Sequence, residues 1–163
     1  MSQLTFKFPF KATYYKEDFY VSSNNFDAYR LIESWPNWSS QNINIYGPTG
    51  CGKTHLSKIL QKKINSYLIK AANINNKSFQ QIKSKDCLII DEYKNDIEEK
   101  LFYSILNQCF QSNKYIIINS KEPIKKINIE LVDLKSRLDS FVSTGIDLPT
   151  DDLIRVILTK GFS

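Results

Sequence analysis

The sequence predicts an α/β protein in which helices cover both faces of a parallel sheet. Residues 87–90 and 115–118 are apolar at every position, as expected for strands that are buried on both sides. Strand-like and helix-like segments alternate along the chain, which is typical of a parallel sheet. Residues 47–54 read Gly-Pro-Thr-Gly-Cys-Gly-Lys-Thr between a strand-like and a helix-like segment, the context of a phosphate-binding loop.

Hydrophobic periodicity gives the order of the elements. The first helix ends before Pro36, because proline restricts the backbone of the preceding residue. Residues 43–46 alternate between apolar and polar side chains like a short strand, and the segment after residue 53 carries apolar residues at helical spacing. The predicted helices span 26–34, 54–64, 79–83, 97–110, 130–138 and 151–159. The predicted strands span 43–46, 66–70, 87–91, 115–118 and 141–146.

The octapeptide 47–54 fits the pattern G-x-x-x-x-G-K-[ST] without a mismatch. Glycine at positions 47, 50 and 52 permits backbone angles that a side chain would forbid. Lys53 is expected to reach the β- and γ-phosphates, and the Thr54 hydroxyl is expected to bind Mg²⁺. Backbone N–H groups at the start of the following helix surround an anion. The sequence therefore predicts binding of a nucleoside triphosphate or diphosphate.

Polar residues that suit hydrolysis of a phosphate bond follow the apolar strands. Asp91 is expected to hold Mg²⁺, and Glu92 beside it to polarise the attacking water. Asn119 would lie between these two motifs, where it could bond the water or the γ-phosphate, or it could simply initiate a turn. Arg137 lies past the core strands, where an arginine often faces a neighbouring subunit's nucleotide, although its spacing alone favours an exposed helical arginine.

Composition is that of an ordinary globular domain. The 163 residues suffice for one domain, with 42% hydrophobic and 24% charged residues. Neither a signal peptide nor a membrane-spanning run is evident, and Cys51, Cys87 and Cys109 read as reduced thiols, so a cytoplasmic location is expected. The net charge of +5 permits contact with DNA, but a solvated lysine surface is the simpler interpretation.

Taken together, the motifs resemble the DnaA/Hda group of the AAA+ family, over essentially the whole chain. The phosphate loop with its following His55-Leu56 is similar to that of the group, and segment 17–24 resembles the stretch that lines the adenine. Residues 31–38 look like the Hda-type version of the segment that follows this stretch. Residues 133–138 match the block that carries an arginine finger. The resemblance implies a five-stranded, three-layer αβα core over 14–163. It also implies ATP or ADP binding with Mg²⁺ by an extended set of residues: Gly47, Pro48, Thr49, Gly50, Cys51, Gly52, Lys53, Thr54, His55 and Val21.

The N-terminal tail, residues 1–13, adds a second resemblance. Its opening stretch is similar to the peptide by which Hda-type proteins dock on the DNA polymerase sliding clamp, with four residues in the matching positions: Gln3, Leu4, Phe6 and Phe8. A polar anchor with apolar side chains suits a pocket, although an edge strand or a disordered tail would also carry such residues. The resemblance implies a replication-initiation regulator that uses Arg137 in trans on ATP bound to the DnaA initiator. Its own ATPase activity would then be secondary.

Two departures from the group accompany this resemblance. The helical lid of the group is expected to be absent, since the sequence ends at Ser163, where the lid begins. Asn119-Ser120 stands where DnaA proteins usually have a Ser-Asp pair.

Two alternative functions are a DnaC-type helicase loader, which would bind single-stranded DNA through its lysines, and a clamp-docking adaptor that catalyses nothing. The initiator itself is disfavoured, because neither its extra N-terminal domains nor its helix-turn-helix is evident.

Overall fold

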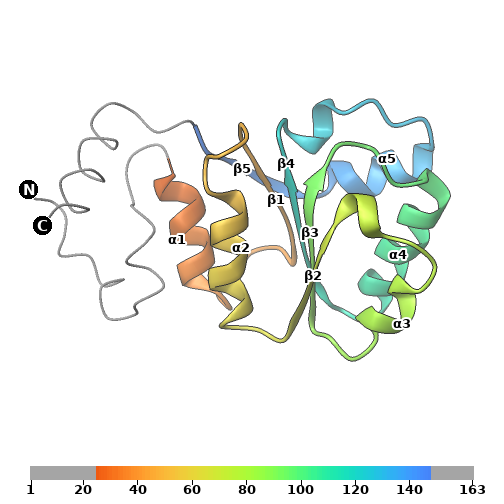
Figure 1. The fold of residues 1–163 in the computed structure, drawn as a ribbon, viewed down its shortest axis with the longest axis horizontal. Helices are drawn as coiled ribbons and strands as arrows, with labels where there is room; N and C mark the ends of the chain where they lie inside the picture. The colour runs from red at the N-terminus through yellow and green to blue at the C-terminus, as the bar shows by residue number, and fades with distance from the viewer. Residues whose placement is uncertain (1–24, 148–163) are drawn as a thin grey trace, which may run out of the picture.

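Five parallel strands form one sheet in the computed structural model, which describes residues 25–147 (Figure 1). The strands are β1 (Asn42–Tyr46), β2 (Ser66–Lys70), β3 (Cys87–Tyr93), β4 (Tyr115–Ser120) and β5 (Val142–Gly145). Their order in the sheet is β2-β3-β4-β1-β5, and every neighbouring pair is parallel. The predicted α/β fold with a parallel five-stranded sheet is confirmed. The predicted helix over 151–159 lies outside the described residues.

Helices cover both faces of the sheet, as Figure 1 shows. They are α1 (Phe26–Ser34), α2 (Lys53–Gln61), α3 (Ser78–Ile82), α4 (Glu99–Gln111) and α5 (Val132–Asp139), with short 3₁₀ turns η3 (Ala71–Asn73) and η4 (Ile124–Lys126). The sequence predicts all five helices to within three residues at each end. The largest difference is at α2, which ends at Gln61, while Ile64 stays buried in a turn whose N–H bonds Leu60 O at 3.1 Å.

Alternate residues of each strand enter two separate cores. In β3, Cys87 and Ile89 pack on the side of α1 and α2, whereas Leu88 and Ile90 pack on the side of α3, α4 and α5. All four residues are fully buried. A continuous apolar run is therefore what this strand requires, because neither face of the sheet meets water. The α4 and α5 layer is thereby separated from α2 by the sheet.

Strand β1 carries a polar residue, Asn44, in its alternating pattern, and this residue does not face solvent. Asn44 is fully buried, and its amide makes four hydrogen bonds. Its Nδ2 donates to Ile118 O at 2.9 Å and to Ser120 Oγ at 3.0 Å. Its Oδ1 accepts from Ile124 N at 3.1 Å and from Ser143 Oγ at 3.2 Å. Asn44 thus joins β1 to β4, η4 and β5.

The three cysteines are buried free thiols, as predicted. Burial raises the pKa of Cys109 to about 11, and it raises the pKa of Cys87 as well. These two thiols therefore stay protonated at neutral pH and pack as small apolar side chains. Among residues 25–147, no helix is both long enough and apolar enough to cross a membrane.

Candidate nucleotide-binding site

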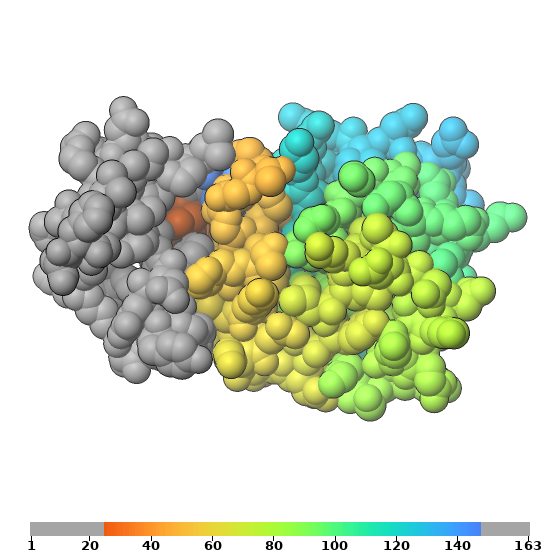
Figure 2. All heavy atoms as spheres, viewed as in Figure 1, coloured from red at the N-terminus to blue at the C-terminus, as the bar shows by residue number. Residues whose placement is uncertain are grey.

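The loop between β1 and α2 has the backbone that a phosphate-binding loop needs. Gly52 is the N-cap of α2 and has a φ of 106°, a left-handed angle that favours glycine. At Gly47, an added Cβ would lie 2.2 Å from Ile146 O and 2.8 Å from Cys51 Sγ, so only glycine fits. Gly47 N also donates to Ser120 O at 3.0 Å, which ties the loop to the end of β4. In Figure 2 the atoms coloured for residues near 50 lie beside those near 120.

Lys53 begins α2, and its ammonium group is folded back over this loop. Lys53 Nζ donates to Gly47 O and to Pro48 O, the latter at 3.1 Å, and it lies 3.7 Å from Cys51 Sγ. The positive charge is therefore held beside the N-terminus of a helix, where the unpaired N–H groups and the helix dipole also favour an anion. His55 follows in the first turn of α2, and Pro48 and Thr49 lie in the loop itself.

A compact polar cluster joins the loop helix to the end of β3. Thr54 Oγ1 donates to Asp91 Oδ2 at 2.8 Å, and Asp91 is only 4% exposed. The other carboxylate oxygen of Asp91 accepts from Glu92 N and from Asn119 Nδ2, both at 3.1 Å. A hydroxyl and a carboxylate side by side are hard oxygen donors, and Mg²⁺ is commonly held by one or two such groups together with phosphates. The donor set therefore fits the predicted metal.

Asn119 lies between the phosphate loop and Asp91, the position that the sequence indicates. It is fully buried at the end of β4, which separates β1 from β3 in the sheet. Its Nδ2 also donates to Ser57 Oγ at 2.8 Å. The sequence analysis does not predict Ser57 as a site residue, because in the sequence Ser57 only interrupts the apolar face of α2. Ser57 follows Thr54 by three residues, so the two side chains lie on the same side of the helix. This spacing could have identified Ser57 as a neighbour of the site.

Glu92 lies at the rim of this cluster and takes no part in its hydrogen bonds through its side chain. It has a φ of 56° at the irregularity in the pairing of β3 with β4, and its carboxylate is 3.8 Å from Lys70 Nζ. Both side chains are more than 60% exposed, so this ion pair is screened by water. The role of Glu92 toward an attacking water stays a prediction.

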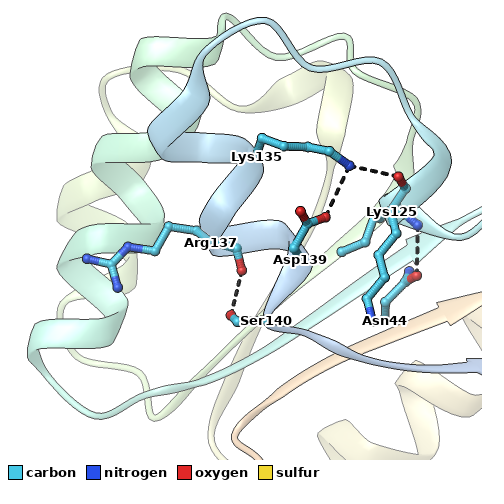
Figure 3. A network of polar contacts seen from close by, with 7 residues as sticks. Asn44, Lys125, Lys135, Arg137, Asp139 and Ser140 are labelled. Carbon is cyan, nitrogen blue, oxygen red and sulfur yellow. Dashed lines mark hydrogen bonds and ion pairs between the residues drawn. The ribbon is translucent and has the colours of Figure 1, made fainter.

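Arg137 belongs to the opposite side of the molecule. Its Nη2 donates to Asn107 Oδ1 at 2.8 Å, and its guanidinium lies 4.7 Å from the centre of the Phe110 ring. In Figure 3 the side chain points toward α4 and away from Asn44. It lines a shallow cleft of about 330 Å³ with Tyr103, Asp133, Ser136 and Ser140. Since the sheet lies between α5 and α2, Arg137 does not reach its own phosphate loop.

Glu99 fixes the start of α5 against α4, and the sequence gives no hint of this role. Its carboxylate accepts from Leu131 N at 2.8 Å, from Glu130 N at 3.3 Å and from Asn95 Nδ2 at 3.4 Å. The hydrogen bond from Leu131 N is the main cause that lowers the pKa of Glu99. Asn95 Nδ2 also donates to Asn128 O at 3.0 Å. The loop after Asp91 and the segment before α5 are therefore bonded together.

Five of the predicted site residues lie outside the described residues. They are Val21, expected at the adenine, and the clamp-peptide residues Gln3, Leu4, Phe6 and Phe8. Within residues 25–147, the structure brings together the loop 47–54, Asp91 and Asn119, and it leaves Arg137 on another face. In the same residues, no cluster of three or more histidine, cysteine or acidic side chains could hold a metal ion. A Mg²⁺ ion at this site would therefore need waters or phosphate oxygens as additional ligands.

The fold and the site define a P-loop NTPase with an AAA+ core, in which β4 separates the strand of the phosphate loop from the strand of the metal-binding carboxylate. A family model described as RNA helicase matches residues 43–130, more than half of the 163 residues. The chain belongs to this family, and the relatives described next identify its core as a DnaA-like AAA+ ATPase domain.

Curated relatives of the chain include chromosomal replication initiator proteins DnaA. The alignment with the protein from Treponema pallidum has 30% identity over 149 positions, and it covers 77% of this chain and 32% of that protein. The alignment with the protein from Corynebacterium jeikeium has 29% identity over 171 positions, and it covers 88% of this chain and 29% of that protein. The chain thus spans about a third of the length of these relatives.

Solved structures give the same result for the fold. A crystal structure of a DNA replication initiation factor superposes with a TM-score of 0.74 and 25% identity, over 91% of this chain and 54% of that one. AMPPCP-bound DnaA from Aquifex aeolicus gives a TM-score of 0.70 and 26% identity, over 90% of this chain and 53% of that one. DnaI superposes with a TM-score of 0.60 at 14% identity, a likeness of fold alone.

Proposed function

We propose that this chain binds ATP or ADP with Mg²⁺ and acts as a regulator of chromosomal replication initiation. The observation that carries the nucleotide site is the hydrogen bond of 2.8 Å between Thr54 and Asp91, with the Lys53 ammonium held over the adjacent loop. Three groups that suit a magnesium–phosphate ligand therefore converge from two elements. The relative from Aquifex aeolicus holds AMPPCP, an ATP analogue, and this supports the assignment.

Each residue has a distinct task in this proposal. Lys53 and the N–H groups at the start of α2 bind the phosphates, and the carboxylate of Asp91 and the hydroxyl of Thr54 hold the metal. Mg²⁺ would neutralise charge on the phosphates when bound. Asn119, already bonded to Asp91 at 3.1 Å, would contact the water or the terminal phosphate. Glu92 would polarise the attacking water from the rim.

The finer proposal concerns partners. The tail residues Gln3, Leu4, Phe6 and Phe8 would dock on the DNA polymerase sliding clamp, and Arg137 would stabilise the transition state of ATP bound to the DnaA initiator. Support for a role in trans comes from the position of Arg137, whose guanidinium lies beside Asn107 and Phe110 on the face of the sheet away from α2. An arginine there can serve a neighbour's nucleotide and not its own. Contact with DNA would be indirect or nonspecific.

Removing Mg²⁺ is expected to weaken nucleotide binding about tenfold, or about 1.4 kcal/mol, because two ligands of the metal come from the protein. The measurement is a calorimetric titration with ADP and with AMPPCP, in Mg²⁺ and in EDTA. Asp91→Asn should abolish the difference between the two conditions. Asp86→Asn, at an exposed position just before the same strand, should preserve it. If the wild type binds no nucleotide in Mg²⁺ and none in EDTA, the proposed site is wrong.

Arg137→Ala is expected to lower the activation of ATP hydrolysis on DnaA about a thousandfold, the effect of losing an arginine that stabilises transition-state charge. The assay follows phosphate release from ATP-bound DnaA in the presence of a sliding clamp loaded on DNA. Lys135→Ala is the matched control, because it removes a cation from the same helix. The Gln3→Ala/Phe6→Ala variant should fail in the assay and in direct clamp binding. Full activation by Arg137→Ala would remove the catalytic role of this residue.

A further inference from the structure

The buried amide of Asn119 is held in one orientation by two acceptors. Its Nδ2 carries two protons, and it donates to Ser57 Oγ at 2.8 Å and to Asp91 Oδ1 at 3.1 Å. Ser57 and Asn119 are fully buried and Asp91 is 4% exposed, so water does not replace these bonds. The three side chains come from α2, β4 and β3, which meet only in the folded chain.

In the same orientation the carbonyl oxygen of the Asn119 amide accepts no hydrogen bond in the described part of the chain. This oxygen, Oδ1, is buried. The reverse orientation would place this oxygen against the carboxylate of Asp91, which accepts and cannot donate when ionised. A buried acceptor without a partner calls for a specific explanation, such as a ligand or a water that completes it. An amide oxygen suits a donor such as water, whereas the oxygens of a phosphate would repel it.

We propose that Ser57 is a positioning residue for nucleotide hydrolysis, acting through Asn119. This inference rests on the proposed nucleotide site. Its hydroxyl accepts the second amide proton and thereby keeps the carbonyl oxygen of Asn119 as the acceptor for an attacking water. Asp91 alone would hold one proton of the amide and leave the group free to tilt. Ser57 lies one helical turn after Thr54, so the residue that orients Asn119 shares a helix with the phosphate-binding groups.

The test compares Ser57→Ala, Asn119→Ala and the double variant with the wild type. Single-turnover ATP hydrolysis gives the rate, and calorimetric titration with Mg²⁺-AMPPCP gives the affinity. Ser57→Ala should slow hydrolysis about tenfold while affinity stays within about twofold, because the serine touches no phosphate. In the Asn119→Ala background, Ser57→Ala should change the rate less than about twofold, since the two residues act as one unit. Ser57→Thr keeps the hydroxyl and should stay closer to the wild type than Ser57→Ala.

Several outcomes would overturn the inference. An unchanged rate for Ser57→Ala would do so, and so would equal losses of rate and affinity, or effects of the two substitutions that multiply independently. A wild type that binds nucleotide without any turnover would also overturn it while leaving the binding site intact. A wild type that binds no nucleotide would instead refute the proposed function. Thermal unfolding of each variant confirms that it is folded before its rate is compared.

Discussion

Lys53→Ala is expected to weaken the binding of Mg²⁺-ATP about a hundredfold, equal to about 2.7 kcal/mol. The ammonium group lies over the loop carbonyls of Gly47 and Pro48, where a bound phosphate would meet it directly. Without this group, only the backbone N–H groups of the loop and of the helix start bind the phosphate, and no full positive charge faces it. The stability of the free protein should change little, because the two freed carbonyl oxygens can bond water.

The controls for Lys53→Ala separate local chemistry from net charge. Lys58→Ala removes the same charge from the exposed side of α2, and it should leave the affinity within about twofold of the wild type. Lys53→Arg keeps the charge but replaces a compact ammonium with a planar fork, so it should restore only part of the affinity. The measurement is a titration with a fluorescent ATP analogue at two salt concentrations. Equal affinities of Lys53→Ala and the wild type would show that the nucleotide binds elsewhere.

Local sequence patterns predict the fold and part of the candidate site. The phosphate loop and Asp91 could be placed because each is a short segment whose residue types, spacing and flanking strand are read together. The apolar strands could be placed because burial on both faces removes the need for polar positions. The same logic brings the end of the strand at Asn119 to this edge of the sheet, but the pattern alone fits a residue that initiates a turn equally well.

The remaining features depend on contacts between distant parts of the chain. Ser57 gains its meaning from Asn119, 62 positions away, and Glu99 from Leu131, 32 positions away. Hydrophobic periodicity along the sequence does not predict hydrogen bonds between residues so far apart. Glu92 differs from these residues, because a short motif predicts its role toward an attacking water and its exposed side chain lies beside Lys70 in the structure. The alternating pattern of residues 43–46 predicts a strand, but it does not show that Asn44 is fully buried or that it bonds Ile118 and Ile124.

Asn44→Ala is expected to lower the free energy of unfolding by about 3 kcal/mol. The substitution removes an amide that makes four hydrogen bonds, and it leaves Ile124 N without its acceptor in a fully buried position. A buried donor without a partner costs about 1–3 kcal/mol, and the truncated side chain leaves a cavity beside it. Urea unfolding followed by circular dichroism measures the loss, provided that the slope of the transition is unchanged.

Asn42→Ala provides the matched control for this prediction. Asn42 lies on the same strand and the same face, but its Oδ1 is buried without a hydrogen-bond partner in the described residues. Removing it should therefore change stability by less than about 0.5 kcal/mol, or raise it. Equal destabilisation by both substitutions would mean that packing in β1, and not the amide network, sets the cost. A loss confined to Asn44→Ala, with faster hydrogen exchange in β5, would show that this one amide holds the edge strand to the strand that leads into the phosphate loop.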